Sequence, residues 1–173
     1  MTEEECKNEI DNIYNRLENT WTLWAHLPHD TDWSLESYKI IDNEIDTVEK
    51  IISINEALPE KLVKNCMLFI MKKGINPIWE DKQNESGGCF SYKISNKYVK
   101  DIWTKLTYNL LGETLTNDEN IHNIINGITI SPKKNFCVFK IWTNTCDYKN
   151  AEIITKIDDQ IIPDGCLFKK HIN

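Results

Sequence analysis

Hydrophobic and polar residues alternate along several short segments of the chain, as they do in strands with one buried face. In residues 20–27, Trp21 and Leu23 share one parity, whereas Trp24 points to the other side. The same criteria predict further strands at residues 37–42, 66–71, 89–95, 127–131, 136–143 and 166–171. A polar turn at residues 132–135 joins two of these strands, so we expect a hairpin there.

Other segments repeat their apolar residues at helical spacing. Residues 46–59 begin with Asp46 and Glu49 in a capping-box arrangement and end at a proline, which predicts a helix. A second helix is predicted over residues 97–111, where a glycine follows the last apolar residue. Weaker helical patterns cover residues 3–18 and 147–160.

The strands come in groups with helices between them, and strand and helix do not alternate regularly. This order favours the α+β class, with a mostly antiparallel sheet and helices on one face. The other face of such a sheet stays open to water or to a ligand. At 173 residues the chain fits one domain, residues 1–173, whose acidic segment 1–18 is expected to form a short helix or to be disordered.

Composition narrows the range of functions. A net charge of −7 argues against general affinity for a nucleic-acid backbone, so any such contact has to be a local basic patch. The chain starts with acidic residues and has no apolar run near the about 18 residues of a membrane span, so we expect a cytoplasmic protein, with the nucleus as the other compartment. The six cysteines show neither zinc spacing nor a disulfide framework and are expected to be reduced, mostly in strands.

The sequence offers little support for catalysis. The four histidines lie in none of the common hydrolase or metalloprotease motifs. His26 and His29 are close in sequence, but two ligands do not make a metal site. The chain also lacks a glycine-rich phosphate loop. We therefore expect a protein that is not an enzyme and has neither metal nor cofactor.

The tryptophans carry the strongest functional signal. Trp21 and Trp103 lie on apolar stripes and are expected in the core, whereas Trp33 and Trp79 lie in polar, turn-rich loops. Each loop tryptophan can simply cover the edge of the core, or the two can sandwich a planar ring. A positively charged ring would add cation–π attraction, and Glu80 beside Trp79 can accept two N–H bonds from a guanine edge. A guanine that carries positive charge is 7-methylguanosine.

The phosphates of such a nucleotide require nearby cations. Lys133 and Lys134 occupy the tip of the predicted hairpin, and Lys140 shares the strand face of Trp142. A turn with two lysines is ordinarily just a solvated turn. The lysines become candidates for phosphate binding because of the residues around them.

Five segments of the chain follow one another in the same order as in eukaryotic translation initiation factor 4E, and the chain resembles that family. The resemblance spans residues 20–143 and rests on the segments TWTLW, IDTVEKI, INPIWED, IWTKLTYNLLGE and FKIWT. It implies a curved antiparallel sheet backed by about three helices, with the messenger RNA cap bound on the concave side. It also implies the site residues: Trp33 and Trp79 as the stacking pair, Glu80 as the guanine acceptor, Trp142 against the methyl group, and Lys133 where the family has a phosphate-binding arginine.

The chain departs from the family's pattern on both sides of the sheet. Cys89 and Val138 stand where the family has basic residues, which implies a rebuilt or weakened phosphate grip. The surface that the resemblance implies for the scaffold factor 4G comprises Val48, Ile52, Trp103, Thr104, Thr107, Tyr108 and Leu111. Ile52 replaces an expected tryptophan, and threonines replace leucines, which argues against the usual scaffold and its mimic repressors.

The sequence is compatible with three functions. The first is cap binding in translation initiation by a monomer, and the second is a repressor or decoy that sequesters the cap without a scaffold. The third is an aromatic cage for another methylated cation, such as methyl-lysine. The bias towards lysine, asparagine and isoleucine suggests a divergent, viral or parasite member of the family.

Overall fold

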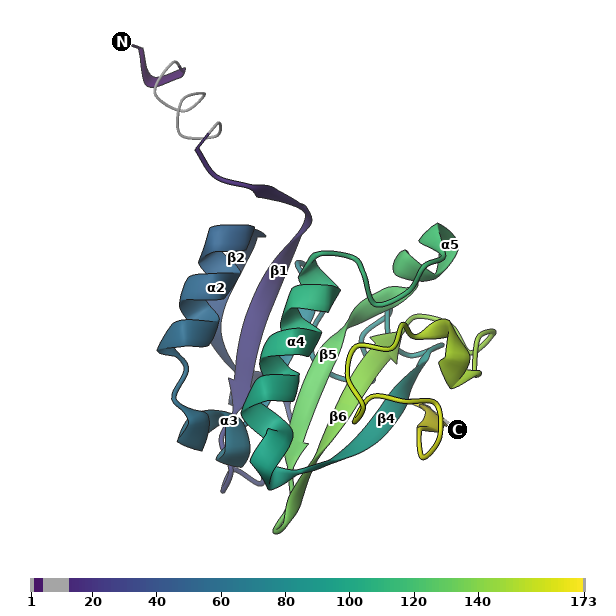
Figure 1. Cartoon of the computed structure of the whole chain (residues 1–173). Coiled ribbons are helices and arrows are strands. Elements are labelled where there is room, and N and C mark those ends of the chain that lie inside the picture. Colours follow the sequence, from purple (N-terminus) through teal and green to yellow (C-terminus); the bar gives the residue numbers. More distant parts are fainter. Residues whose placement is uncertain (1, 5–12, 173) are drawn as a thin grey trace.

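The computed structural model describes residues 2–4 and 13–172. Its strands form one curved seven-stranded sheet with the order β2-β1-β3-β5-β6-β4-β7 (Figure 1). All neighbouring strands in it are antiparallel, which confirms the predicted fold class. The strands are β1 (Arg16–His26), β2 (Lys39–Thr47), β3 (Met67–Lys72), β4 (Gly88–Ser95), β5 (Ile125–Pro132), β6 (Phe136–Thr143) and β7 (Leu167–Lys170).

The longer helices lie together on one face of the sheet (Figure 1). They are α2 (Val48–Ala57), α3 (Glu60–Asn65) and α4 (Val99–Leu111), and a fourth, α5 (Glu119–His122), is a single turn before β5. Trp103 and Leu106 of α4 are fully buried against the sheet, and Trp21 of β1 is buried in the same core. The prediction that Trp21 and Trp103 are core residues is therefore confirmed. None of the helices in the described part of the chain is long and apolar enough to span a membrane.

Side chains of each strand divide between two hydrophobic clusters on opposite faces of the sheet. In β3, Leu68 and Ile70 join the large core under the helices, whereas Phe69 and Met71 join a smaller cluster on the open face. That smaller cluster consists of Phe69, Met71, Ile75, Cys89 and Trp142, with Trp24, Tyr38 and Met67 packed against it. The open face of the sheet therefore has an aromatic floor.

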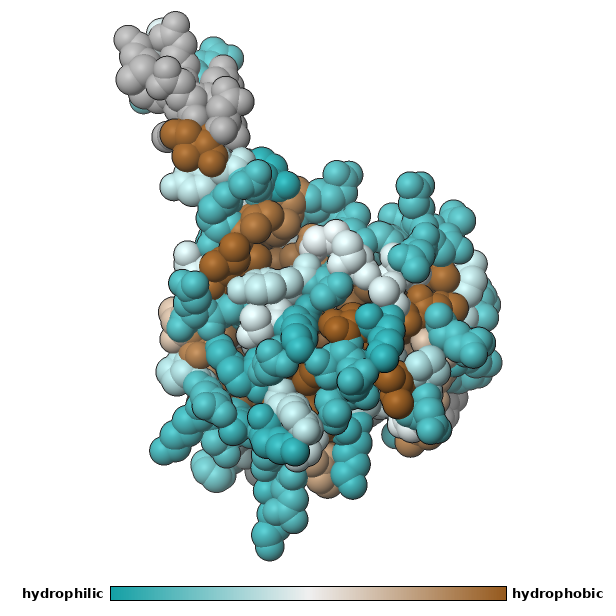
Figure 2. Space-filling view, in the orientation of Figure 1, coloured by the Kyte–Doolittle hydropathy of each residue, from teal (hydrophilic) through white to brown (hydrophobic). Residues whose placement is uncertain are grey.

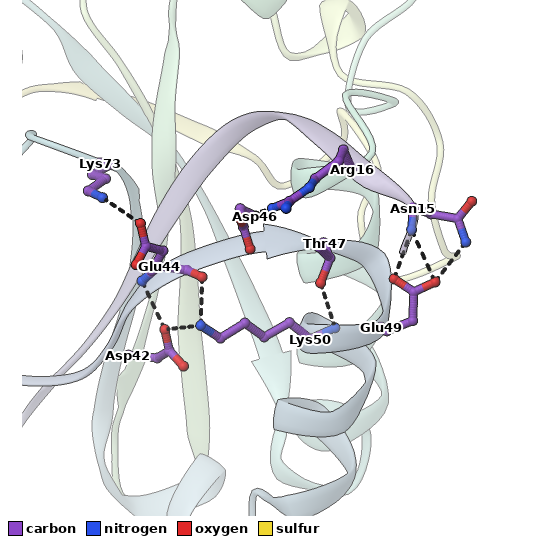
Figure 3. A network of polar contacts seen from close by, with 9 residues as sticks. All are labelled: Asn15, Arg16, Asp42, Glu44, Asp46, Thr47, Glu49, Lys50 and Lys73. Carbon is purple, nitrogen blue, oxygen red and sulfur yellow. Dashed lines mark hydrogen bonds and ion pairs between the residues drawn. The ribbon is translucent and has the colours of Figure 1, made fainter. Parts of the chain in front are cut away.

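The start of α2 differs from the predicted capping box. Thr47 is the N-cap, and its hydroxyl accepts a hydrogen bond from the Lys50 N–H at 3.3 Å. Asp46 still belongs to β2, and its carboxylate pairs with Arg16 instead of capping the helix (Figure 3). The same network holds further polar pairs: Asn15 with Glu49 at 2.7 Å, Lys50 with Asp42 at 3.1 Å and Lys73 with Glu44 at 3.1 Å.

The helix predicted for residues 147–160 is wrong, because this segment contains one 3-10 turn, Ala151–Ile153, in an otherwise irregular path. Tertiary contacts hold the segment in place. Ile154 and Ile161 are buried in the main core, and the Thr155 N–H donates to the Leu115 carbonyl at 2.8 Å. The apolar spacing therefore reflects anchoring to the core and not a helical face.

Smaller differences concern the ends of the chain and the cysteines. Half of the helix predicted for residues 3–18, namely residues 5–12, lies outside the described residues, and residues 16–18 belong to β1. The short helices α3 and α5 have no counterpart in the sequence predictions. The described cysteines are free, but only Cys89 and Cys137 among them lie within strands, so the expectation that most do is wrong. Cys66 and Cys166 each immediately precede a strand.

Candidate functional site

A cavity of about 550 Å³ lies on the open face of the sheet, away from the helices. Its walls come from β1, β3, β5 and β6, from the loop after β1 and from the loop before β4. Of the residues predicted to form the site, those that line this cavity are Trp33, Trp79, Glu80, Lys133, Lys140 and Trp142. Lys134 lies at the exposed hairpin tip and is not among the lining residues.

The loop after β1 presents Trp33 with one face covered. The imidazole of His26 stacks on the Trp33 ring, with centroids 4.2 Å apart and an angle of 2° between the planes. His26 Nε2 also lies 2.8 Å from the Asp32 carbonyl, and Asp32 accepts hydrogen bonds from the backbone and hydroxyl of Ser34. Trp33 is nevertheless 56% exposed, so its other face is available to a ligand.

His26 was not predicted as a site residue. The sequence signal that could have found it is its parity, because it follows Trp24 by two positions on the open face of β1. In the structure the ring of His26 stacks on Trp33, whereas His29 is exposed. No group of three His, Cys, Asp or Glu residues that could hold a metal occurs in residues 2–4 and 13–172.

The loop before β4 uses its two adjacent acids differently. Asp81 accepts hydrogen bonds from the Asn76 backbone and side chain, both at 3.0 Å, and from the Gln83 N–H at 2.9 Å. Asp81 therefore closes the loop. Glu80 lines the cavity with an exposed side chain, and its negative charge contributes, after burial, to raising the pKa of Tyr38.

The Gly-Gly pair that ends this loop is required by close packing. A Cβ atom on Gly87 would lie 1.7 Å from the Thr143 carbonyl oxygen at the end of β6. A Cβ atom on Gly88 would lie 2.6 Å from the Lys169 carbonyl oxygen in β7. Neither position can carry a side chain, so the two glycines fix how the Trp79 loop joins the sheet.

Trp142 forms part of the cavity floor and is 2% exposed. Its ring packs edge-to-face with Phe69 at 6.4 Å and lies 4.5 Å from the ring of His171. His171 also lies parallel to Trp79, with centroids 6.4 Å apart. His171 thus contacts one of the predicted site tryptophans and lies parallel to another, although the sequence contained no motif that marked it.

A buried polar network holds His171 in that position. Its Nδ1 lies 2.8 Å from the Asn84 carbonyl, and the Asn84 side chain bonds to the Asn76 and Ile78 carbonyls at 2.9 Å. Burial lowers the pKa of His171, and the charge of Lys140 adds to this effect against the Asn84 hydrogen bond. His171 is therefore a neutral ring that ties the end of β7 to the Trp79 loop.

The cations of the cavity are Lys133 at its exposed rim and Lys140 within it. The Lys140 ammonium lies 5.9 Å from the centroid of the Trp79 ring. Cys89 is buried in the floor cluster, and Val138 is half-buried, so neither supplies a charge at the positions where the resemblance implied one. Any anionic group of a ligand in this cavity depends on the two lysines.

The helix-covered side carries the second predicted surface, and it is only partly accessible. This side is mostly hydrophilic, with separate apolar patches (Figure 2). Val48, Ile52 and Tyr108 are exposed, and Thr104 is half-buried. The other members of the predicted surface are buried and cannot contact a partner in this structure: Trp103, Thr107 and Leu111.

A buried hydrogen-bond network explains why these positions face inward. The Asn55 side chain accepts from the Trp103 indole N–H at 3.1 Å and donates to the Thr107 hydroxyl at 2.7 Å. These two bonds turn Trp103 and Thr107 towards α2. The exposed apolar surface is accordingly reduced to a few side chains.

Comparison with known proteins places these features in context. The model of the family described as eukaryotic initiation factor 4E matches residues 16–170. The eukaryotic translation initiation factor 4E of Candida albicans is 29% identical over 83% of this chain and 71% of its own length. A homolog of that factor from Acanthamoeba polyphaga mimivirus is 47% identical over 36% of this chain and 23% of its own.

Solved structures show the same fold. The structure of C. elegans eIF4E-3 with the 4E-binding protein Mextli and a cap analog superposes with a TM-score of 0.77. The match covers 91% of this chain and 93% of that one, at 19% sequence identity. The architecture is thus shared although most of the residues differ.

Proposed function

Because this chain belongs to the eukaryotic initiation factor 4E family, we propose that it binds the 7-methylguanosine cap of messenger RNA in translation initiation and catalyses no reaction. One observation carries the proposal for the site. Two half-exposed tryptophans, one free carboxylate and two lysines from four separate segments converge on a single cavity. This combination suits a flat, cationic base that is followed by phosphates.

The tryptophans provide stacking. Trp33 and Trp79 are 56% and 43% exposed, an unfavourable arrangement in water that a bound ring would relieve. Stacking of a base on an aromatic side chain contributes about 1–3 kcal/mol, and the positive charge of a methylated guanine adds cation–π attraction. Trp142 lies in the floor, where it would contact the methyl group.

Glu80 provides base recognition. Its side chain is exposed in the cavity and belongs to no hydrogen bond of the loop, because Asp81 fulfils that role. A carboxylate can accept from both N–H groups on the Watson–Crick edge of guanine, and such charge-assisted bonds are strong. Adenine presents no matching pair of donors, so Glu80 favours guanine.

Lys133 and Lys140 provide the phosphate contacts. Both line the cavity, one at the rim and one on the sheet. Lysine binds phosphate as a point charge, without the bidentate geometry of arginine. The phosphate contribution is therefore electrostatic and should weaken as salt is added.

The helix-covered side would bind a protein of the scaffold class. The C. elegans relative is solved with a 4E-binding protein. In this chain the exposed apolar residues Val48, Ile52 and Tyr108 are available for such a contact on α2 and α4. Because this surface is small, we expect a partner whose contact residues match these few apolar side chains.

The proposal is tested by tryptophan fluorescence. Addition of 7-methyl-GTP should quench the emission strongly and at much lower concentration than GTP, since only the methylated ring is a cation. The matched control is Trp79→Ala, which should remove most of the quenching. Equal quenching by 7-methyl-GTP and GTP would refute recognition of the methylated base.

A further inference from the structure

Lys140 occupies an unusual place for a lysine in a site that receives a cation. It rises from β6 on the open face, two residues before Trp142, and its strand neighbours are Thr129 and Ser91. Its side chain is half-buried, and its ammonium lies 5.9 Å from the centre of the Trp79 ring. That distance is within the range of about 6 Å for cation–π attraction.

No carboxylate of the described residues forms an ion pair with Lys140. Its partner in the cavity is the π face of Trp79, and its charge also acts on the nearby ring of His171. Lys133, the other lysine in the lining, lies at the exposed rim and contacts no aromatic ring of the described chain. The two lysines of the cavity are therefore not equivalent.

We propose that Lys140 is a specificity-determining residue: its ammonium holds the Trp79 face in the free protein, and a methylated guanine must displace it towards the phosphates. This inference rests on the proposed function. A cationic base and a lysine cannot share one ring face, because their like charges repel in a half-buried cavity. The lysine stem is long and flexible, so the ammonium can swing to a nearby anion.

The displacement gives Lys140 opposite effects on different ligands. A nucleoside without phosphates has to remove the ammonium from Trp79 and offers it no anion in return. A 5′-triphosphate supplies that anion, so the same movement becomes favourable. Lys140 thereby selects methylated guanine that is attached to phosphates over the free methylated nucleoside, although both present the same base to Trp33, Trp79 and Glu80.

The free-state contact can be tested without a ligand. Protons next to an ammonium above an indole ring experience its ring current, so the Lys140 Cε protons should resonate upfield of other lysines in NMR spectra. Trp79→Ala should return them to the ordinary position, whereas Trp33→Ala should not. An ordinary Lys140 signal in the parent protein would overturn the proposal.

The binding test compares Lys140→Gln with Lys133→Gln by calorimetric titration. Lys140→Gln should bind 7-methylguanosine about two- to five-fold more tightly than the parent and 7-methyl-GTP more weakly. Lys133→Gln should weaken 7-methyl-GTP and leave the nucleoside unchanged. Circular dichroism and thermal melts should show that both variants fold as the parent does.

The outcomes separate this inference from the function on which it rests. Unchanged or weaker nucleoside binding by Lys140→Gln, with normal cap binding by the parent, would overturn the role of Lys140 alone. Failure of the parent to bind either methylated ligand would overturn the proposed function, and the inference with it.

Discussion

Neighbouring residues in the Trp79 loop have separate tasks, and the two acids are the clearest case. Asp81 satisfies three donors of its own loop, whereas Glu80 extends into the cavity. The sequence predicted Glu80 as the guanine acceptor, but it could not predict the structural role of Asp81, since that role depends on its contacts with Asn76 and Gln83 in the folded loop. Of the two acids, Glu80 has no hydrogen bond within the loop, and this supports its proposed contact with guanine.

This division predicts opposite results for two alanine substitutions. Glu80→Ala should weaken 7-methyl-GTP binding by roughly 10- to 100-fold and leave the melting temperature unchanged, because it removes hydrogen bonds that only the ligand makes. Asp81→Ala should lower the free energy of unfolding by about 1–3 kcal/mol, because it leaves loop donors without a partner. Calorimetry measures both quantities. A Glu80→Ala variant that melts as early as Asp81→Ala would show that Glu80 is structural.

At the scale of elements, the sequence correctly predicted the helices and strands whose formation depends on local interactions. The hairpin of β5 and β6 and the long helix α4 were predicted within a few residues, because alternation, helical periodicity and a stop signal agree there. The region 147–160 was mispredicted, because its isoleucines reach the core from an irregular backbone. The helix α3 has six residues, too few for a clear period.

The same dependence on local sequence explains which residues of the candidate site could be predicted. Trp33, Trp79, Glu80 and Trp142 could be predicted because each belongs to a recognisable segment of the family. The support from His171 could not be predicted, because its contacts join segments distant in sequence, whereas His26 contacts Trp33 only seven residues away and its strand parity was a signal that was not used. His171 follows β7 and meets a loop 87 residues earlier through the Asn84 carbonyl.

The buried contact of His171 with the Asn84 carbonyl joins the end of β7 to the Trp79 loop, and it predicts that the free energy of unfolding depends on pH. The pKa of His171 is below its ordinary value of about 6.5, chiefly through burial. Above that ordinary value the residue is neutral in both folded and unfolded chains, so stability is fully retained. As the pH falls below about 6.5, the unfolded chain takes up a proton that the folded chain resists, and the free energy of unfolding should fall.

Denaturant unfolding between pH 7.5 and 5 checks this prediction. His171→Phe keeps an aromatic ring between Trp79 and Trp142 but does not titrate, so its stability should fall less over this interval. The contribution of one group is limited to about 1.4 kcal/mol per pH unit. His29→Gln, at an exposed position, is the control and should behave as the parent does. An identical pH profile for parent and His171→Phe would show that His171 does not cause the loss of stability at low pH.

At the scale of the whole molecule, the candidate site is a cavity on an acidic protein. The net charge is −7, and the edge strand β2 carries the acids Asp42, Glu44 and Asp46, with Glu49 in the first turn of the adjacent helix α2 (Figure 3). Such a surface does not attract an RNA backbone in general. The fold thus leaves the methylated end of the RNA as the feature to be recognised, with helices on the opposite face of the sheet.

We propose that the methylated guanine lies between Trp33 and Trp79, above Trp142, in this cavity. The most direct measurement is of nuclear Overhauser effects from the 7-methyl protons of bound 7-methyl-GTP to indole protons in otherwise deuterated protein. We expect contacts from the methyl group to Trp142 and from the base to Trp33 and Trp79. Binding with no contact to any of these three indoles would contradict this proposal.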